Sequence, residues 1–180
     1  MKKKVLNYLL VSVIFLTGIF SFVPTTEAGI YLSSRSPSNT VKYRLSGFSG
    51  VDSTALSESF AHWNSSTNIT VSSLSVSNNT LAIGSYSDSW FGQHIRSGIS
   101  GQFHSKSDIK INKKTLLAEY SIVYQKAVVR STITHEIGHN FGLDDNPHSS
   151  KNGSIMNHNR DRRTLYNLTS FDKVNLKKYY

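Results

Sequence analysis

Hydrophobic positions recur along the chain with two different periods, which predict β-strands in some segments and helices in others. Residues that are apolar at every second position are typical of strands. Four segments carry this pattern, at positions 41–45, 69–71, 80–85 and 108–112. A shorter segment around Gln102–Ser105, bounded by glycines, predicts an additional strand at an edge of the sheet.

Apolar residues that recur three or four positions apart predict three helices. The first begins near Asp52 or Ser53, either of which could cap its N-terminus. Its inward face would carry Leu56, Phe60 and Trp63. The last is a short C-terminal helix that opens with the capping-box pattern Thr169-x-x-Asp172.

The second predicted helix is the longest and spans Leu117–Phe141. Its apolar face would carry Ile122, Val129, Ile133 and Ile137. Gly142 follows as a natural C-terminal stop. From 144 to 167 the chain consists mostly of turn-forming and charged residues, and loops of that length in compact domains are often functional.

The N-terminus has the pattern of a secretory signal. Three lysines precede a mostly apolar run at positions 5–23, and Thr26-Glu27-Ala28 offers small residues for cleavage after Ala28. The sequence therefore predicts a signal peptide at 1–28, one domain at 29–180 and an extracellular location. The alternative is an uncleaved membrane anchor, because the run approaches the roughly 20 residues that span a bilayer.

The composition narrows the function classes. The net charge is +9, and removal of the predicted signal leaves 17 basic and 10 acidic residues, a net charge of +7. These charges are scattered without interleaved aromatic residues, so we expect solvated surface charge, which could favour adhesion to anionic cell-wall polymers, and no nucleic-acid partner. The chain has no cysteine, which excludes thiolate metal sites and cysteine nucleophiles.

One short motif contains the residue types of a metal-dependent catalytic site. His135 and His139 are four residues apart on the predicted helix, so their imidazoles lie on one face about a turn apart. Two neutral imidazoles at this spacing suit a Zn²⁺ ion. Glu136 lies beside the first histidine, where it could reach a metal-activated water as a general base. A bare HExxH also arises by chance, so its continuation matters.

The motif continues as HExxHxxGxxD. A glycine at position 142 lets the backbone leave the helix in a left-handed turn, which returns the next segment toward the metal. Asp145 is then the predicted third zinc ligand, with His148 as the rival. Asp144 is expected to face solvent or to orient a ligand.

The stretch from His135 to Asp145 resembles the metzincin zinc signature, and more narrowly the catalytic domain of bacterial matrixins, with the aspartate ligand of snapalysin-like metzincins. Met156 in GSIMN matches the methionine turn of that clan. Weaker similarity extends over positions 31–180. The resemblance implies a zincin fold of mixed α/β (α+β) class. It has a twisted, mostly parallel sheet of about five strands with an antiparallel edge strand, an active-site helix, the methionine turn and a C-terminal helix.

The resemblance also implies a function. The chain would be a secreted, monomeric zinc endopeptidase of the extracellular matrix type, with one catalytic Zn²⁺ and no stable membrane association after signal cleavage. Its extended polypeptide substrate would lie along the edge strand near Phe103. Two alternatives are a catalytically idle zinc-binding adhesion domain and a basic polymer-binding protein with a chance HExxH.

A second cation site is a further option. Four residues in the stretch 85–108 could bind a structural Zn²⁺ or Ca²⁺: His94, His104, Asp88 and Asp108. No ligand spacing supports such a site, so surface histidines are the default expectation.

Overall fold

Strands and helices alternate along the chain and form one sheet with helices packed on it. The computed structural model describes residues 31–146 and 148–180. The strands are β1 (Thr40–Ser46), β2 (Thr70–Ser73), β3 (Thr80–Gly84), β4 (Gly92–Ser100) and β5 (Phe103–Asn112). The helices are α1 (Gly50–Ser66), α2 (Lys113–Glu119), the 3₁₀ helix η1 (Ile122–Tyr124), α3 (Gln125–Asn140) and α4 (Ser170–Leu176). The predicted signal peptide at 1–28 lies outside the described residues.

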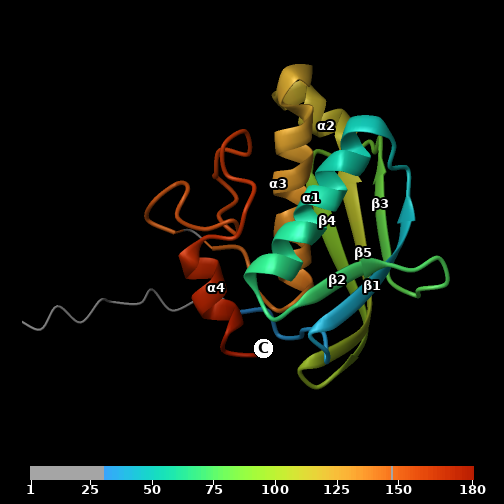
Figure 1. Cartoon of the computed structure of the whole chain (residues 1–180), viewed down its shortest axis with the longest axis vertical. Helices are drawn as coiled ribbons and strands as arrows, with labels where there is room; N and C mark the ends of the chain where they lie inside the picture. Colours follow the sequence, from blue (N-terminus) through green and yellow to red (C-terminus); the bar gives the residue numbers. More distant parts are fainter. Residues whose placement is uncertain (1–30, 147) are drawn as a thin grey trace, which may run out of the picture.

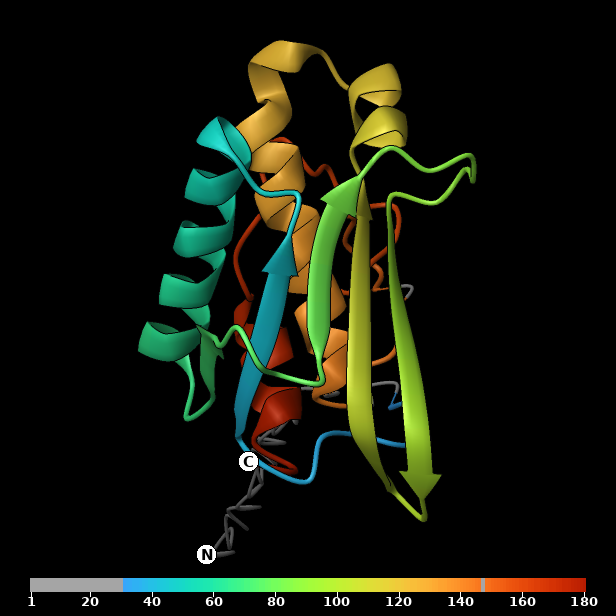
Figure 2. The ribbon, with the colours of Figure 1, turned by 90° about the vertical axis from the view of Figure 1, so that its right-hand side faces the viewer.

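The five strands form a mostly parallel sheet in the order β2-β1-β3-β5-β4. Strands β1, β2, β3 and β5 pair in parallel, and β4 pairs with β5 in the antiparallel direction. Strand β4 is therefore an antiparallel edge strand, visible at the right of Figure 2. This architecture confirms the predicted zincin fold class.

The position of the edge strand differs from the prediction. The segment Gln102–Ser105 does not form a separate strand, because Phe103 begins β5. The edge strand is β4, which the hydrophobic pattern does not reveal. Its isoleucines Ile95 and Ile99 are 39% and 56% exposed. The more covered positions of the strand hold polar residues, so no apolar alternation marks it.

Helices α1 and α3 lie side by side against one face of the sheet, as Figures 1 and 2 show. The core lies between these layers. Within it Trp63 of α1 and Phe141, just after α3, are fully buried with ring centroids 5.6 Å apart. Helix α4 and the segments 144–146 and 148–168 lie on the other side of α3 (Figure 1). None of the described helices has the length and apolar character needed to cross a bilayer.

The predicted helix Leu117–Phe141 is broken in the structure. Helix α2 ends at Glu119, Ser121 has an extended backbone with ψ 150°, and η1 leads into α3 at Gln125. Ile122, predicted to face inward, is 62% exposed. The isoleucine and valine of the sequence SIVY are β-branched, which weakens helix propensity at the break.

Asp52 is not the N-cap of the first helix. Ser49 occupies the N-cap position, although its side chain makes no capping hydrogen bond. Asp52 lies in the first turn, 2% exposed, and accepts hydrogen bonds from Lys113 Nζ at 2.7 Å and Gln125 Nε2 at 2.6 Å. This buried carboxylate therefore joins the starts of α1, α2 and α3.

Candidate metal centre

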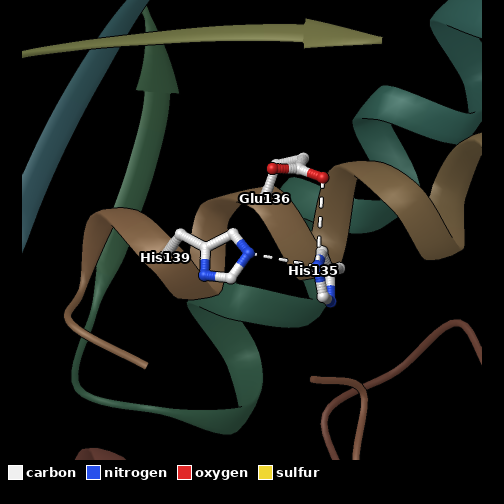
Figure 3. A group of neighbouring side chains, drawn as sticks. All are labelled: His135, Glu136 and His139. Carbon is white, nitrogen blue, oxygen red and sulfur yellow. Dashed lines mark hydrogen bonds and ion pairs between the residues drawn. The ribbon is translucent and has the colours of Figure 1, made fainter. Parts of the chain in front are cut away.

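The two histidines of the HExxH motif converge on one point in the structure. His135 and His139 lie on α3 one turn apart, and their Nε2 atoms are 3.1 Å apart (Figure 3). An Oε1 atom of Glu136 lies 3.9 Å from Nε2 of His135. The ligand atoms of these three residues all lie within 4.8 Å of one another.

Backbone carbonyl groups determine which imidazole nitrogens carry hydrogen. His135 Nδ1 lies 2.9 Å from the Ile155 carbonyl oxygen, and His139 Nδ1 lies 2.8 Å from the Leu143 carbonyl oxygen. A carbonyl oxygen can only accept, so each Nδ1 donates. In the neutral rings each Nε2 then holds a lone pair. This is the tautomer that a metal ligand requires, with the second nitrogen oriented by a backbone acceptor.

The geometry of the pair fits a zinc ion. Two lone pairs that face each other at 3.1 Å repel unless a cation lies between them. Tetrahedral Zn²⁺ with bonds of 2.0–2.1 Å places two nitrogen ligands about 3.3–3.4 Å apart. Burial, followed by the nearby charge of Arg160, lowers the pKa of His135, which keeps its ring neutral.

Asp145 lies beside this pair. Its Oδ1 is 3.3 Å from His135 Nε2 and 3.9 Å from His139 Nε2. Burial alone would raise the pKa of Asp145, but its contacts with the two histidines outweigh burial and lower it. The carboxylate form, which a cation needs, is therefore favoured.

The two other candidates lie differently. The ring of His148 packs edge-on against Phe171 of α4, with centroids 4.9 Å apart, and its Nδ1 accepts a hydrogen bond from Ser150 N–H. The carboxylate of Asp144 accepts the backbone N–H of Asp145 at 2.8 Å. The structure thus brings Asp145 to the histidine pair, packs His148 on the C-terminal helix and uses Asp144 within the turn.

A glycine-dependent turn delivers Asp145 to the pair. Gly142 has φ +88°, in the left-handed region that disfavours other residues. Leu143 N–H donates to the Gly138 carbonyl and Gly142 N–H to the His139 carbonyl. These are the two bonds of a Schellman motif, which ends α3 and reverses the chain. The same turn presents the Leu143 carbonyl to His139.

Met156 lies directly beneath the metal-binding helix. A Cβ atom added at Gly138 would be only 2.6 Å from the Met156 sulfur, so the thioether occupies the space that this glycine leaves open. Asn146 N–H donates to the Met156 carbonyl. This bond connects the turn around Met156 to the segment that carries Asp145. The residue before it, Ile155, supplies the carbonyl that orients His135.

Helix α4 stabilises the turn around Met156 through one buried carboxylate. Asp172 is 1% exposed and accepts hydrogen bonds from Ser154 Oγ and from Ile155 N–H. It also accepts the Thr169 N–H, while Thr169 accepts the Asp172 N–H, which confirms the predicted capping box. The box therefore both starts α4 and fixes the carbonyl that orients His135.

The surroundings of Glu136 adjust its proton affinity. The side chain is buried, and burial raises its pKa to about 7, opposed by the charges of His139 and Arg160. Gly92 of β4 lies against it, because an added Cβ would be 2.3 Å from the Glu136 Oε1 atom. A carboxyl group in this environment can take up and release a proton near neutral pH.

Comparison with known proteins decides the family. The reprolysin model of metallo-peptidase family M12 matches residues 24–168, which is most of the chain. The chain belongs to metallo-peptidase family M12. A search of curated proteins gives no match. Among solved structures, a chain of the GM1-bound form of the ECX AB5 holotoxin is 18% identical and has a TM-score of 0.50. That similarity covers 83% of this chain and 84% of the other, and at this identity it supports the fold alone.

Family membership confirms the metallopeptidase part of the resemblance and does not extend to its finer part. The matching family model is that of the M12 metallopeptidases. It does not support the narrower expectation of a matrixin, or that of a substrate in the extracellular matrix.

The cleft of this M12 metallopeptidase holds residues that the sequence does not point to. It measures about 200 Å³ and opens beside the histidine pair. Its lining comes from the N-terminal segment, β4, α3 and the turn after it: Leu32, Gly92, Gln93, His94, Arg96, His135, Glu136, His139 and Asp145. Strand β4 contributes four of the five residues that the sequence does not mark as cleft residues, and recognition of β4 as the edge strand would have revealed those four.

The second cation site is not assembled among the described residues of this M12 metallopeptidase. His94 and His104 are near each other, with ring centroids 5.7 Å apart, but their Nε2 atoms pair with Ser107 and Asn140. Asp108 accepts Lys106 and Thr80, and Asp88 is exposed. The four residues therefore have separate structural roles.

A buried arginine lies behind the pair. Arg160 is 2% exposed and donates to Ser131 of α3 and to the Asn157 carbonyl beside the methionine. Its Nη1 also lies 3.2 Å from His135 Nδ1, which is no hydrogen bond in this tautomer, because both nitrogens carry hydrogen. Burial lowers the pKa of Arg160 to about 9, above neutral pH, so the guanidinium remains charged beside the metal centre. No sequence pattern indicates this residue as part of the site.

Proposed function

We propose that this chain is a secreted zinc-dependent endopeptidase that hydrolyses peptide bonds of protein substrates. The observation that carries the proposal is the convergence of two Nε2 lone pairs at 3.1 Å, with both Nδ1 atoms held by backbone carbonyls. Membership of family M12 supports it, because M12 peptidases are zinc enzymes. The signal-like segment at 1–28 supports secretion, and we propose that the mature chain is monomeric.

The proposed zinc ligands are His135, His139 and Asp145. The Oδ1 atom of Asp145 lies 3.3 Å from His135 Nε2, close to the roughly 3.3–3.5 Å that neighbouring nitrogen and oxygen ligands of one tetrahedral zinc would have. Three protein ligands leave the fourth position open for chemistry. An aspartate adds negative charge, which makes this site a weaker Lewis acid than three histidines would.

Glu136 is the proposed general base. Bound zinc supplies Lewis acidity, which polarises a carbonyl and lowers the pKa of water. Glu136 takes the proton of the attacking water and passes it to the leaving amine. Its raised pKa, about 7, suits both transfers, and its burial between β4 and α3 keeps bulk water from the carboxylate.

The substrate is proposed to lie extended along the edge of β4. An edge strand presents unpaired backbone donors and acceptors to which a polypeptide can add as a further strand. Strand β4 lines the cleft and reaches Glu136 at Gly92. The predicted contact near Phe103 is replaced by β4, because Phe103 begins β5 instead of the edge strand.

A proteolysis assay with metal removal tests the proposal. Purified protein without the segment 1–28 is incubated with denatured casein, alone, with a zinc chelator, and with zinc restored after the chelator is removed. We expect cleavage that the chelator abolishes and zinc restores. Bound zinc without cleavage would favour the alternative, an idle zinc-binding interaction domain. Absence of stoichiometric zinc would contradict both.

A further inference from the structure

The cleft beside the metal centre carries one permanently charged cation among the described residues. Arg96 of β4 lines the cleft together with Leu32 and His94. The acidic residues of the cleft, Glu136 and Asp145, both belong to the metal centre. A guanidinium that faces a substrate channel and does not belong to the reacting group is a candidate for substrate selection.

Arg96 is held in place but keeps part of its hydrogen-bonding capacity. Its Nη1 donates to Ser34 Oγ at 3.1 Å and to the Ser34 carbonyl at 3.4 Å. Within the described parts of the chain, Nε and Nη2 of Arg96 donate to no partner, and no carboxylate lies within 4 Å. The Nε and Nη2 edge of a guanidinium can bind a carboxylate with two parallel hydrogen bonds.

The location of Arg96 relative to the reacting centre follows from the strand. Gly92 lies against Glu136, so the scissile bond would lie opposite the start of β4. Arg96 is four residues further along, which is roughly 13 Å in an extended strand. His94 and Arg96 both line the cleft, whereas Ile95 between them is 39% exposed, so the two polar side chains share the cleft side.

The direction of an added strand decides which side of the scissile bond Arg96 contacts. Antiparallel pairs are more stable per residue than parallel ones and outnumber them. A substrate antiparallel to β4 would place its residues N-terminal to the scissile bond beside Arg96. The net charge of +7 that remains after removal of the predicted signal also favours the approach of acidic segments.

We propose that Arg96 selects substrates with an acidic side chain about four residues N-terminal to the scissile bond. The proposal rests on the endopeptidase function proposed above and names a substrate class for it. Arg96 binds the acidic side chain through its Nε and Nη2 edge, while Ser34 keeps the guanidinium in position through Nη1.

Matched peptide pairs test the proposal. Fluorogenic peptides are compared that differ only by glutamate or glutamine at the fourth or third position N-terminal to the scissile bond. We expect kcat/KM to be about two- to fivefold higher for the glutamate peptide at one of these positions, as for a partly exposed ion pair. The preference should disappear in Arg96→Gln, persist in part in Arg96→Lys, reverse in Arg96→Glu and weaken at high salt. Arg44→Gln is the matched control, because Arg44 lies on β1 away from the cleft, and it should keep the preference.

The outcomes separate two failures. The proposal is overturned if kcat/KM is the same for the glutamate and glutamine peptides in the wild type, or if Arg96→Gln leaves their ratio unchanged. It is also overturned if Arg96→Gln reduces the cleavage of both peptides equally, because Arg96 would then only anchor Ser34. If no peptide is cleaved, the endopeptidase function fails. In that case the binding of the same labelled peptides to zinc-loaded Glu136→Gln protein is measured. Tighter binding of the glutamate peptide supports selection of an acidic side chain by Arg96, and equal binding of both peptides overturns it.

Discussion

Replacement of Asp172 by alanine tests whether the C-terminal helix supports the metal centre. The Asp172 carboxylate is 1% exposed and accepts hydrogen bonds from Ser154 Oγ, from Ile155 N–H at 2.9 Å and from Thr169 N–H at 2.7 Å. Ile155 in turn presents its carbonyl to His135 Nδ1. Removal of the carboxylate leaves buried donors without an acceptor and releases the carbonyl that orients a proposed zinc ligand.

The magnitude follows from the bonds that are lost. A hydrogen bond to a charged group contributes about 1.5–3 kcal/mol, and losses within one network do not add fully. We therefore expect Asp172→Ala to reduce the free energy of unfolding by about 3–5 kcal/mol. Asp172→Asn keeps an acceptor for the two backbone N–H groups and should cost less. Zinc affinity should fall about 10- to 100-fold in the alanine variant, as when the group that orients a ligand is removed.

Two measurements check this prediction. Urea unfolding of metal-free protein gives the change in stability, and competition with a fluorescent chelator gives the zinc affinity. Asp161→Ala is the control, since Asp161 pairs with Arg163 at the surface and its loss should cost no more than about 1 kcal/mol. An Asp172→Ala protein within about 0.5 kcal/mol of wild type, with unchanged zinc affinity, would refute the support role.

Three further predictions address the ligands, the pH response and the base. Asp145→Ala should weaken zinc binding by at least about 100-fold, as measured by chelator competition, whereas His148→Ala should bind zinc like the wild type. Burial, followed by the charge of a nearby lysine, lowers the pKa of His62 to about 4 from 6.5, so the unfolded chain binds a proton that the folded chain excludes. The contribution of His62 to the free energy of unfolding should therefore be fully present above pH 6.5 and be lost as the pH drops from 6.5 toward 4. Urea unfolding across this range should show that the free energy of unfolding declines less steeply in His62→Gln than in the wild type. Gly92→Ala should keep zinc but lower kcat for peptide cleavage about 10- to 100-fold, because the new methyl group displaces the Glu136 carboxylate. Equal kcat values in Gly92→Ala and the wild type would show that the contact between Gly92 and Glu136 is not needed for catalysis.

The parallel part of the sheet and the start of the site could be predicted because local patterns encode them. Alternation of apolar residues in segments such as Val41–Leu45 reflects burial on one face, and the structure confirms β1, β2, β3 and β5. HExxH sets the positions of His135 and His139 through helical spacing alone. Gly142 follows the same logic, because its left-handed φ is available mainly to glycine.

The remaining features depend on contacts between distant segments. The hydrophobic pattern does not indicate strand β4, because its cleft side carries the polar residues His94 and Arg96 and its apolar Ile95 and Ile99 are exposed. The break before α3 at Ser121 has no glycine or proline to mark it.

The contacts that position the metal centre could not be predicted from local patterns either. Arg160 reads as one of several surface charges in the sequence, yet it is buried behind His135 and binds Ser131 of α3. Asp172 could be predicted as part of a capping box, because that pattern is local. Its contact with Ile155, seventeen residues earlier, depends on how α4 packs against the turn.

The measurement that tests the central claim most directly combines zinc content and peptide hydrolysis in wild-type protein and in Glu136→Gln. Glu136 is proposed to move protons and not to hold the metal, so both proteins should bind one zinc per chain. Cleavage should fall by at least about 100-fold in the variant, as expected for loss of a general base. A wild-type protein without stoichiometric zinc, or a variant that cleaves as well as the wild type, would contradict the account.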